Sequence, residues 1–366
     1  MPFDLDLDYL PRLPRQKDLG IGCVGAGFIM RDCHLLAYRQ AGYNPVAITS
    51  RQVDRARAVA QQYAIPRVHA TVDELLSDPA VAVLDVAVPP DLQADIIRKA
   101  VRHKDHIKGI LAQKPLAMSV RDARDCVESC ARAGITLAVN QNMRYDQSIR
   151  AMKDVLRRGL IGAPVLSTID MRAIPHWMPW SEGLPSLSTF IMSIHHLDTF
   201  RYWFGTPDRV LASTRPDPRT KFPHTDGINL YILEYDNGCR ASSWDDVWTG
   251  PAREGSQSDI GIRWRVEGTD GLARGTIGWP SYPARTPSTL DFTTKQQAGY
   301  WFQPRWPEVW FPDAFVGTMS QLLCAVEEGK EPEISGRDNV ETIALCAAVF
   351  AAAKEHRVTT VREFLQ

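Results

Sequence analysis

The sequence of 366 residues has no surplus of charge of either sign, because 42 lysines and arginines nearly balance 43 aspartates and glutamates. A chain without a basic excess has little to offset the phosphates of a nucleic acid, so nucleic acid is not an expected partner. The sequence also lacks an apolar run near the roughly 18 residues of a membrane span, and its first residues lack the order of a signal peptide. We therefore expect a soluble, cytoplasmic protein with no membrane partner.

Paired cysteine motifs are also absent. The seven cysteines are spread along the chain and none forms a Cys-x-x-Cys pair, so we expect neither a disulfide framework nor a metal site. Cys126 and Cys130 are four residues apart and share one face of a predicted helix. We interpret them as packing residues, because a free cysteine behaves as a small apolar side chain.

Two patterns of predicted elements follow one another along the chain. Before about residue 145, short apolar runs alternate with amphipathic stretches, which is typical of a parallel sheet with crossover helices. These predicted strands are residues 20–24, 45–49, 81–88, 107–112 and 135–139. Beyond this point, the turns Asp236-Asn237-Gly238 and Thr269-Asp270-Gly271 predict β-hairpins. Two amphipathic helices near the C-terminus are expected to pack on the second sheet or on the first domain.

The sequence thus predicts an α/β N-terminal domain built on a doubly wound parallel sheet, and an α+β C-terminal domain built on a mostly antiparallel open sheet. A chain of 366 residues is long enough for two hydrophobic cores. We place the first domain at residues 1–145, with residues 1–18 as an N-terminal arm, and the second at residues 146–366.

A glycine-rich segment follows the first predicted strand. Gly20, Gly22 and Gly25 formally match the Gly-x-Gly-x-x-Gly pattern, but the first two lie inside the strand, where they cannot form the turn that the motif needs. The register that opens the next helix begins at Gly25 and Gly27, where bare backbone allows a pyrophosphate to approach a helix N-terminus. We therefore expect a dinucleotide-binding Rossmann domain.

The end of the second predicted strand carries Thr49, Ser50 and Arg51. Dinucleotide-binding domains that use NAD place an acid here, which accepts hydrogen bonds from the ribose hydroxyls. A hydroxyl and a guanidinium suit a 2′-phosphate instead, because arginine donates charge-assisted hydrogen bonds to oxyanions. We expect NADP as the cofactor, with NAD as the alternative.

Candidate catalytic residues lie in both halves of the chain. Lys114 follows the strand predicted at residues 107–112, so it falls at the carboxyl edge where open α/β sheets bind ligands. His195 and Asp198 are three residues apart in a predicted helix, where the carboxylate can orient an imidazole that acts as a base. Tryptophans near these residues suit a polyhydroxylated ring, and packing explains each of them equally well.

The order of these motifs resembles the glucose–fructose oxidoreductase, inositol dehydrogenase and rhizopine-catabolism family, or Gfo/Idh/MocA. The motifs are the glycine loop, Pro89-Pro90, Lys114-Pro115, the His195-x-x-Asp198 helix and the closing helices. The resemblance covers nearly the whole chain. It implies that Lys114 contacts substrate and cofactor, that His195 is the base, and that Asn140 contacts the nicotinamide half of the cofactor. It also implies a sugar, sugar derivative or cyclitol as substrate. We expect a homo-dimer or homo-tetramer formed through the C-terminal sheet.

Three positions depart from the pattern of this family. Gln113 stands where the family usually has glutamate, Ile191 where it has aspartate, and Gln93 where a histidine is common. These losses leave open a catalytically silent dinucleotide- or sugar-binding regulatory protein. A metal-dependent sugar isomerase or hydrolase that uses the histidines and aspartates of the second half is a further alternative.

Our prediction is an NAD(P)-dependent dehydrogenase or reductase that transfers a hydride between the nicotinamide and a carbinol or carbonyl group. The predicted catalytic residues are Lys114, His195 and Asp198. The predicted cofactor-binding residues are Gly25, Gly27, Phe28, Ile29, Ser50, Arg51, Val88, Pro89, Gln93, Gln113, Lys114 and Asn140. The predicted substrate-binding residues are Trp177, Trp180, His196 and Asp245.

Overall fold

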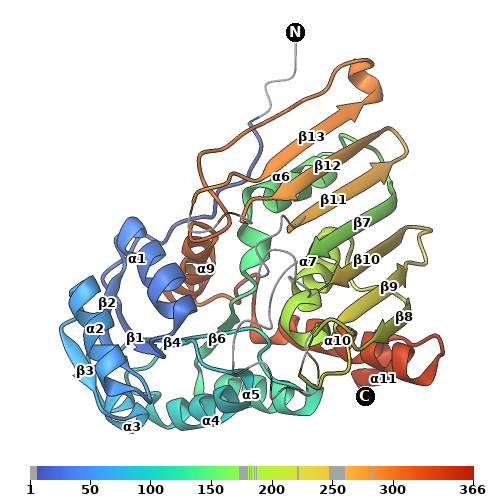
Figure 1. The fold of residues 1–366 in the computed structure, drawn as a ribbon. Coiled ribbons are helices and arrows are strands. Elements are labelled where there is room, and N and C mark those ends of the chain that lie inside the picture. The colour runs from blue at the N-terminus through green and yellow to red at the C-terminus, as the bar shows by residue number, and fades with distance from the viewer. Residues whose placement is uncertain are drawn as a thin grey trace. The chain divides into compact units, whose positions relative to one another are not determined.

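The computed structural model describes residues 6–172, 180, 182, 184, 186, 188–220, 222–246, 260–279, 281 and 284–366. The chain folds into two compact units, each made of separate stretches of sequence. One unit comprises residues 11–142 and 311–343, and the other comprises residues 1–10, 143–310 and 344–366. Each unit is built around its own sheet, and the predicted α/β and α+β architectures are confirmed (Figure 1). The assignment of roles to residues 1–145 and 146–366 stays a prediction.

The first unit contains a six-stranded sheet in the order β3-β2-β1-β4-β5-β6. All of its strand pairs are parallel, as the sequence predicts. The strands are β1 (Gly20–Val24), β2 (Asn44–Thr49), β3 (Arg67–His69), β4 (Val83–Val86), β5 (Gly109–Ala112) and β6 (Thr136–Val139). The five predicted strands are present, whereas β3 was not predicted. The reversal of strand order between β1 and β4 creates the switch point at which such sheets bind ligands.

Helices cover both faces of this sheet. They are the π-helical turn η1 (Ile29–His34), α1 (Leu35–Ala41), α2 (Val53–Tyr63), α3 (Val72–Leu76), α4 (Pro90–Ala100), the 3₁₀ turn η2 (Val101–His103), α5 (Val120–Ala133) and α9 (Ala314–Glu328). The side chain of Thr71 caps α3 by accepting a hydrogen bond from the amide of Glu74, at 3.1 Å. Helix α9 packs on β5, β6 and α1, so residues 311–343 return to the first sheet.

The second unit contains a seven-stranded sheet in the order β13-β12-β11-β7-β10-β9-β8. Its strands are β7 (Pro164–Arg172), β8 (Arg209–Arg215), β9 (Ile228–Glu234), β10 (Arg240–Asp246), β11 (Gly261–Gly268), β12 (Gly271–Ile277) and β13 (Thr289–Thr294). Among these described strands, β7 and β10 pair in parallel, and the other neighbouring pairs are antiparallel. The predicted hairpins β9–β10 and β11–β12 are both present, and Gly238 supplies the positive φ of 93° that the first turn needs.

Helices lie on one face of this second sheet (Figure 1). The structure also describes the helical elements η3 (Asn142–Tyr145), α6 (Gln147–Arg157), η6 (Thr189–Ser193), α7 (Ile194–Phe204), η7 (Lys295–Gln297), α10 (Gly336–Glu355) and α11 (Val361–Phe364). Between α7 and β11 the core includes Trp203 and Trp264, whose ring centroids lie 5.4 Å apart. Across the described part of the chain, every helix is too short or too polar to cross a membrane.

Candidate functional site

The glycine loop begins where β1 ends. Gly25 has a φ of +110°, and a Cβ atom there would lie 2.3 Å from the carbonyl oxygen of Ala87. Its amide donates to the carbonyl of Thr49 at 2.9 Å, which ties the loop to the end of β2. Only glycine combines this φ with such close backbone contact. By contrast, Cβ atoms on Gly20 and Gly22 would clash with residues beside β1, so these two glycines serve packing within the strand.

Gly27 differs from Gly25 because the space beside it is open. A Cβ atom on Gly27 would have no heavy atom within 4 Å among the described residues. The next residue, Phe28, is 39% exposed, whereas Met30, at the position of the third glycine in the motif, is fully buried. Bare backbone at the start of a helical segment therefore faces free space, as the phosphates of a dinucleotide require. The residues present fit this cofactor.

The end of β2 provides the predicted selectivity residues. Thr49 pairs with Val24 of β1, so Ser50 and Arg51 follow directly beside the glycine loop. Arg51 is exposed and forms no ion pair within the described residues, and the hydroxyl of Ser50 accepts from the amide of Gln52 at 3.3 Å. The guanidinium is thus available to an anionic group at this edge of the sheet.

Val88 and Pro89 connect β4 to α4. The Cγ1 atom of Val88 lies 3.6 Å from the Cβ position of Gly25, so this connection runs beside the glycine loop. Pro89 precedes Pro90, which occupies the first turn of α4, where a missing amide hydrogen costs no helical bond. Both predicted cofactor residues therefore lie at the carboxyl edge of the sheet.

Gln93 holds the loop that carries Lys114. Its Nε2 donates to the carbonyls of Gln113 at 2.9 Å and Pro115 at 2.8 Å, and its Oε1 accepts from the amide of Gln113 at 2.7 Å. Gln93 is fully buried, and Lys114–Pro115 is a cis peptide. Gln93 therefore shapes the Lys114 loop, while its predicted contact with the cofactor stays a prediction.

Asn140 follows β6 and is fully buried. Its amide donates to the carbonyl of Ala112 at 2.8 Å, which places it beside the end of β5. Its side-chain Nδ2 lies 2.8 Å from Nε2 of His34, a residue that the sequence analysis did not single out. The structure thus brings the predicted residues Gly25, Gln113 and Asn140 to the same edge of the parallel sheet, together with the ends of β1, β5 and β6.

His195 and Asp198 lie in α7 of the second unit, and both are buried. The ring of His195 makes an edge contact with that of Trp310, with centroids 5.7 Å apart. Asp198 accepts from Nε and Nη2 of Arg144 at 2.6 and 2.7 Å, so both of its oxygens are bound by the guanidinium. This bidentate pair anchors α7 to the segment before α6. The predicted role of Asp198 toward His195 stays a prediction.

His196 and Asp245 were predicted to bind substrate. The structure pairs them with each other, at 2.8 Å between Nδ1 and Oδ1, and neither is exposed. Asp245 also accepts hydrogen bonds from the hydroxyls of Ser193 and Ser243. Together with burial, the Asp245 charge raises the pKa of Tyr231 well above its usual range. This network joins the start of α7 to β10.

Trp177 and Trp180 were predicted to bind substrate, and this stays a prediction. Trp177 lies outside the described residues, and Trp180 is 39% exposed. Among the described residues, Trp310 contacts the ring of His195, and Trp279 in turn contacts Trp310 edge to face, with ring centroids 6.3 Å apart. Sequence reasoning missed both, because neither has a local pattern that links it to the histidine helix.

Asp146 is another residue that sequence reasoning missed. It is fully buried at the N-cap of α6, where it accepts from Ser148 and from the hydroxyl of Ser288. Burial raises the pKa of Asp146 to about 6, although these hydrogen bonds oppose the shift. The sequence signal for this residue is its place immediately before an amphipathic helix, where an aspartate caps the helix N-terminus.

Acidic, histidine and cysteine side chains do not cluster into a metal site within the ranges that the structure describes. Asp198 is bound by Arg144, and Asp245 is bound by His196 and two serines. These two aspartates, together with His195 and His196, were the residues of the alternative metal-dependent isomerase or hydrolase, and the oxygens of both aspartates bind other partners.

Comparison with known proteins gives two matches to family models. Residues 19–141 match the model described as an oxidoreductase family with an NAD-binding Rossmann fold, and residues 149–274 match the model of the GFO/IDH/MocA C-terminal domain.

Individual relatives and structures agree with these matches. The chain is 26% identical to D-apiose dehydrogenase of Paraburkholderia graminis, covering 93% of this chain and 88% of that protein. It is 27% identical to 1,5-anhydro-D-fructose reductase of Ensifer adhaerens, covering 91% and 95%. An oxidoreductase of Agrobacterium radiobacter, solved with NAD⁺, L-tartaric acid and magnesium, superposes with a TM-score of 0.80 at 22% identity, covering 94% of this chain and 99% of that structure. Its fold is shared with this chain.

Proposed function

Because the chain belongs to the GFO/IDH/MocA family of NAD(P)-dependent oxidoreductases, we propose that it oxidises a carbinol, or reduces a carbonyl, of a sugar, sugar derivative or cyclitol. The observation that carries this proposal is the glycine loop, in which Gly25 has the required backbone conformation and Gly27 faces open space. The relatives that act on apiose and anhydrofructose support the substrate class.

The cofactor would be held by the glycine loop, by the connection after β4, and by the residues that follow β5 and β6. When bound, the nicotinamide supplies or accepts the hydride, which no side chain can do. We assign NADP as the preferred form, because Arg51 is exposed beside the loop without an acidic partner among the described residues.

The proton would be handled by the chain's own residues. We assign His195 as the base that takes the proton of the substrate hydroxyl, and Lys114 as the donor to the same oxygen. Gln93 and Gln113 support this assignment for Lys114 by fixing its loop, and the Arg144–Asp198 pair supports it for His195 by anchoring α7.

The substrate ring would stack on aromatic side chains near His195. Trp279 and Trp310 support this placement, because an apolar aromatic face complements the C–H face of a sugar ring. Trp180 remains a second candidate, and Trp177 is retained from the sequence analysis alone.

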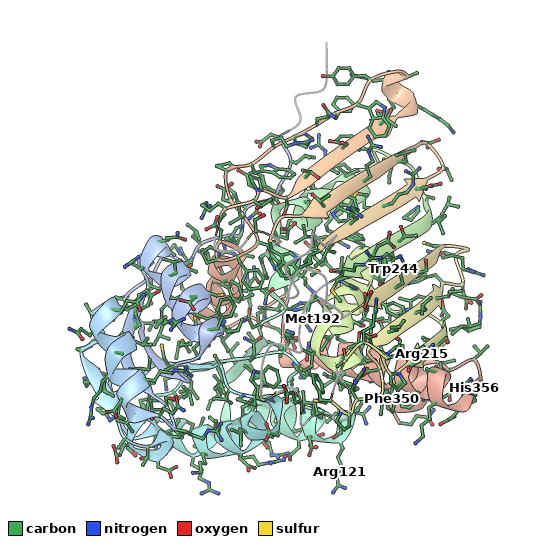
Figure 2. All side chains as sticks on the ribbon, in the orientation of Figure 1. Arg121, Met192, Arg215, Trp244, Phe350 and His356 are labelled. Atoms are coloured by element: carbon green, nitrogen blue, oxygen red, sulfur yellow. The ribbon has the colours of Figure 1, made fainter. Side chains whose placement is uncertain are left out.

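We also propose that the chain forms a homo-dimer or homo-tetramer through the second sheet. Apolar side chains on the face of this sheet opposite α6 and α7 are between 37% and 47% exposed, and they are Leu166, Leu230, Ile232 and Trp244. Trp244 lies on β10 (Figure 2). In the register of the sheet it pairs with Leu230 of β9. Leu230, Ile232 and Trp244 lie on neighbouring strands, and exposed apolar side chains that gather in this way mark an interaction surface.

A screen of cofactor reduction tests the proposed function. Purified protein would be mixed with NAD or NADP and with aldoses, anhydrosugars, sugar acids or inositols, and the absorbance of the reduced nicotinamide would be followed. We expect turnover with at least one polyol, faster with NADP. Failure of the whole panel in both directions, by a protein that binds a dinucleotide, would favour a catalytically silent sensor, for which the buried Ile191 in place of an acid is the supporting observation.

A further inference from the structure

A buried pair of titratable residues lies beneath the carboxyl edge of the parallel sheet. Asp85 is in β4 and His34 ends the π-helical turn η1, and they are 0% and 1% exposed. Nδ1 of His34 lies 2.7 Å from Oδ2 of Asp85, and the hydroxyl of Tyr38 donates to the same oxygen at 2.7 Å. The proposed chemistry uses neither Asp85 nor His34, although burying such a pair is costly.

The hydrogen bonds of this pair select one form of the imidazole ring. A carboxylate only accepts, so Nδ1 of His34 carries the proton that faces Asp85. The other ring nitrogen, Nε2, lies 2.8 Å from Nδ2 of Asn140, which only donates. Both contacts are satisfied together when Nε2 is unprotonated and accepts. Asp85 thereby fixes the tautomer of His34, as carboxylates do for other histidines.

This tautomer in turn fixes the side-chain amide of Asn140. With Nδ2 directed to His34, and also 3.5 Å from Oε1 of Gln113, the carbonyl oxygen Oδ1 points away from both. Oδ1 of Asn140 and Nε2 of Gln113 are buried, and neither has a hydrogen-bond partner among the described residues. Oδ1 of Asn140 is an acceptor and Nε2 of Gln113 is a donor, and the two residues follow the neighbouring strands β6 and β5. Buried unsatisfied groups at such an edge indicate a ligand.

The surroundings of His34 hold its ring in place. Its ring centroid lies 5.8 Å from that of Tyr38 and 5.1 Å from that of Phe315 on α9. The ring therefore packs between aromatic groups of two helices. A rigid ring with a fixed tautomer gives a single orientation of the Asn140 amide.

We propose that Asp85 and His34 are positioning residues for the cofactor, because they direct the carbonyl oxygen of Asn140 toward the carboxamide of the nicotinamide. A carboxamide offers an N–H donor to Oδ1 of Asn140 and a carbonyl acceptor to Nε2 of Gln113. This inference rests on the proposed placement of Asn140 at the nicotinamide. It gives a function to a buried histidine and a buried aspartate that act through Asn140.

The test measures binding of two dinucleotides that differ only in the carboxamide. NADP has the N–H donor, and its 3-acetylpyridine analogue replaces the amino group with a methyl group. We expect the wild type to bind NADP roughly five- to tenfold more tightly than the analogue in calorimetric titrations without substrate, as one lost hydrogen bond predicts. Asn140→Ala should remove this preference.

The decisive variant combines His34→Phe with Asp85→Asn. It keeps the ring packing, leaves no unpaired buried charge and removes the acceptor that orients Asn140. The preference for NADP over the analogue should fall to about twofold or less, through weaker binding of NADP. Tyr38→Phe is the matched control, because it removes the other hydrogen bond to Asp85 and leaves the His34–Asn140 contact intact. It should keep the wild-type preference.

The outcomes separate the inference from the proposed function. A double variant with a cooperative thermal transition and an unchanged preference would overturn the inference. So would a wild type that binds NADP and the analogue equally well, although the proposed function would then stand. A wild type that binds neither dinucleotide would overturn both.

Discussion

Single side chains at the end of β2 decide the expected choice of cofactor. Arg51 is exposed and has no carboxylate partner in the part of the chain that the structure describes, and Ser50 adds a hydroxyl beside it. An arginine interacts with the 2′-phosphate of NADP but gains little from the ribose hydroxyls of NAD. We therefore expect the charge at residue 51 to set the relative affinity for NADP and NAD.

Arg51→Asp should reverse the cofactor preference. The wild type should bind NADP more tightly than NAD, and the variant should bind NAD more tightly, because a carboxylate repels the 2′-phosphate and accepts from the ribose. Fluorescence titration with both reduced cofactors measures the ratio. A tenfold preference of the wild type for NAD, or about 1.4 kcal/mol, would show that the arginine does not select the cofactor.

Asp146 predicts a pH dependence of stability. The pKa of Asp146 in the folded protein is about 6, above its ordinary value of 3.8. The protonated carboxyl group therefore stabilises the folded protein fully below pH 3.8, and this stabilisation is lost as the pH rises through 6. Asp146→Asn keeps the cap without ionising. Urea denaturation should therefore show the variant gaining stability over the wild type between pH 4 and pH 7, by on the order of 3 kcal/mol. A difference that does not change with pH would contradict this assignment.

At the scale of elements, the sequence predicts the strands and turns better than it predicts their side-chain partners. Alternation and glycine positions predicted β1, β5 and both hairpins, whereas β3 has only three residues and no apolar pattern. An aspartate inside the apolar strand β4 was the available signal for Asp85, but its partner His34 is 51 residues away. The contacts of His195 with Trp310 and of Asp245 with His196 depend on tertiary packing, which no local pattern encodes.

The glycine loop offers a matched pair of substitutions. Gly25→Ala forces a side chain into a φ of +110° and against the carbonyl of Ala87, so it should destabilise the protein by at least about 2 kcal/mol. Gly27→Ala meets open space, so the free energy of unfolding should change by less than about 1 kcal/mol. Its affinity for NADP should nevertheless fall at least about tenfold, because the methyl group occupies the path of the pyrophosphate. Chemical denaturation and cofactor titration measure both quantities. Wild-type affinity in Gly27→Ala would place the phosphates elsewhere.

At the scale of the whole molecule, the family match and the two sheets define an oxidoreductase whose open second sheet presents apolar side chains. Burial of that patch in an assembly would remove Leu230, Ile232 and Trp244 from water, which stabilises association. All seven cysteines are buried, Cys126 and Cys130 among them.

Charge placed on the open sheet should dissociate the assembly. Leu230→Glu combined with Ile232→Lys puts two charges on a patch where each wild-type side chain is nearly half exposed, so folding of the monomer should be kept. Light scattering after size-exclusion chromatography should give a dimer or tetramer for the wild type and a monomer for the variant. Leu13→Lys, in the exposed arm, is the control and should keep the wild-type mass. An unchanged mass in the double variant would move the interface to another surface.

The most direct test of the central claim pairs turnover with cofactor binding in Lys114→Ala. Lys114 is proposed to act on the substrate oxygen, and the distant glycine loop is proposed to provide much of the binding free energy of the dinucleotide. The variant should therefore lose turnover by at least about a hundredfold on the best substrate of the screen, while its dissociation constant for NADP stays within several-fold of the wild type. Turnover near the wild-type rate would contradict the account, because the proton would then be handled without Lys114.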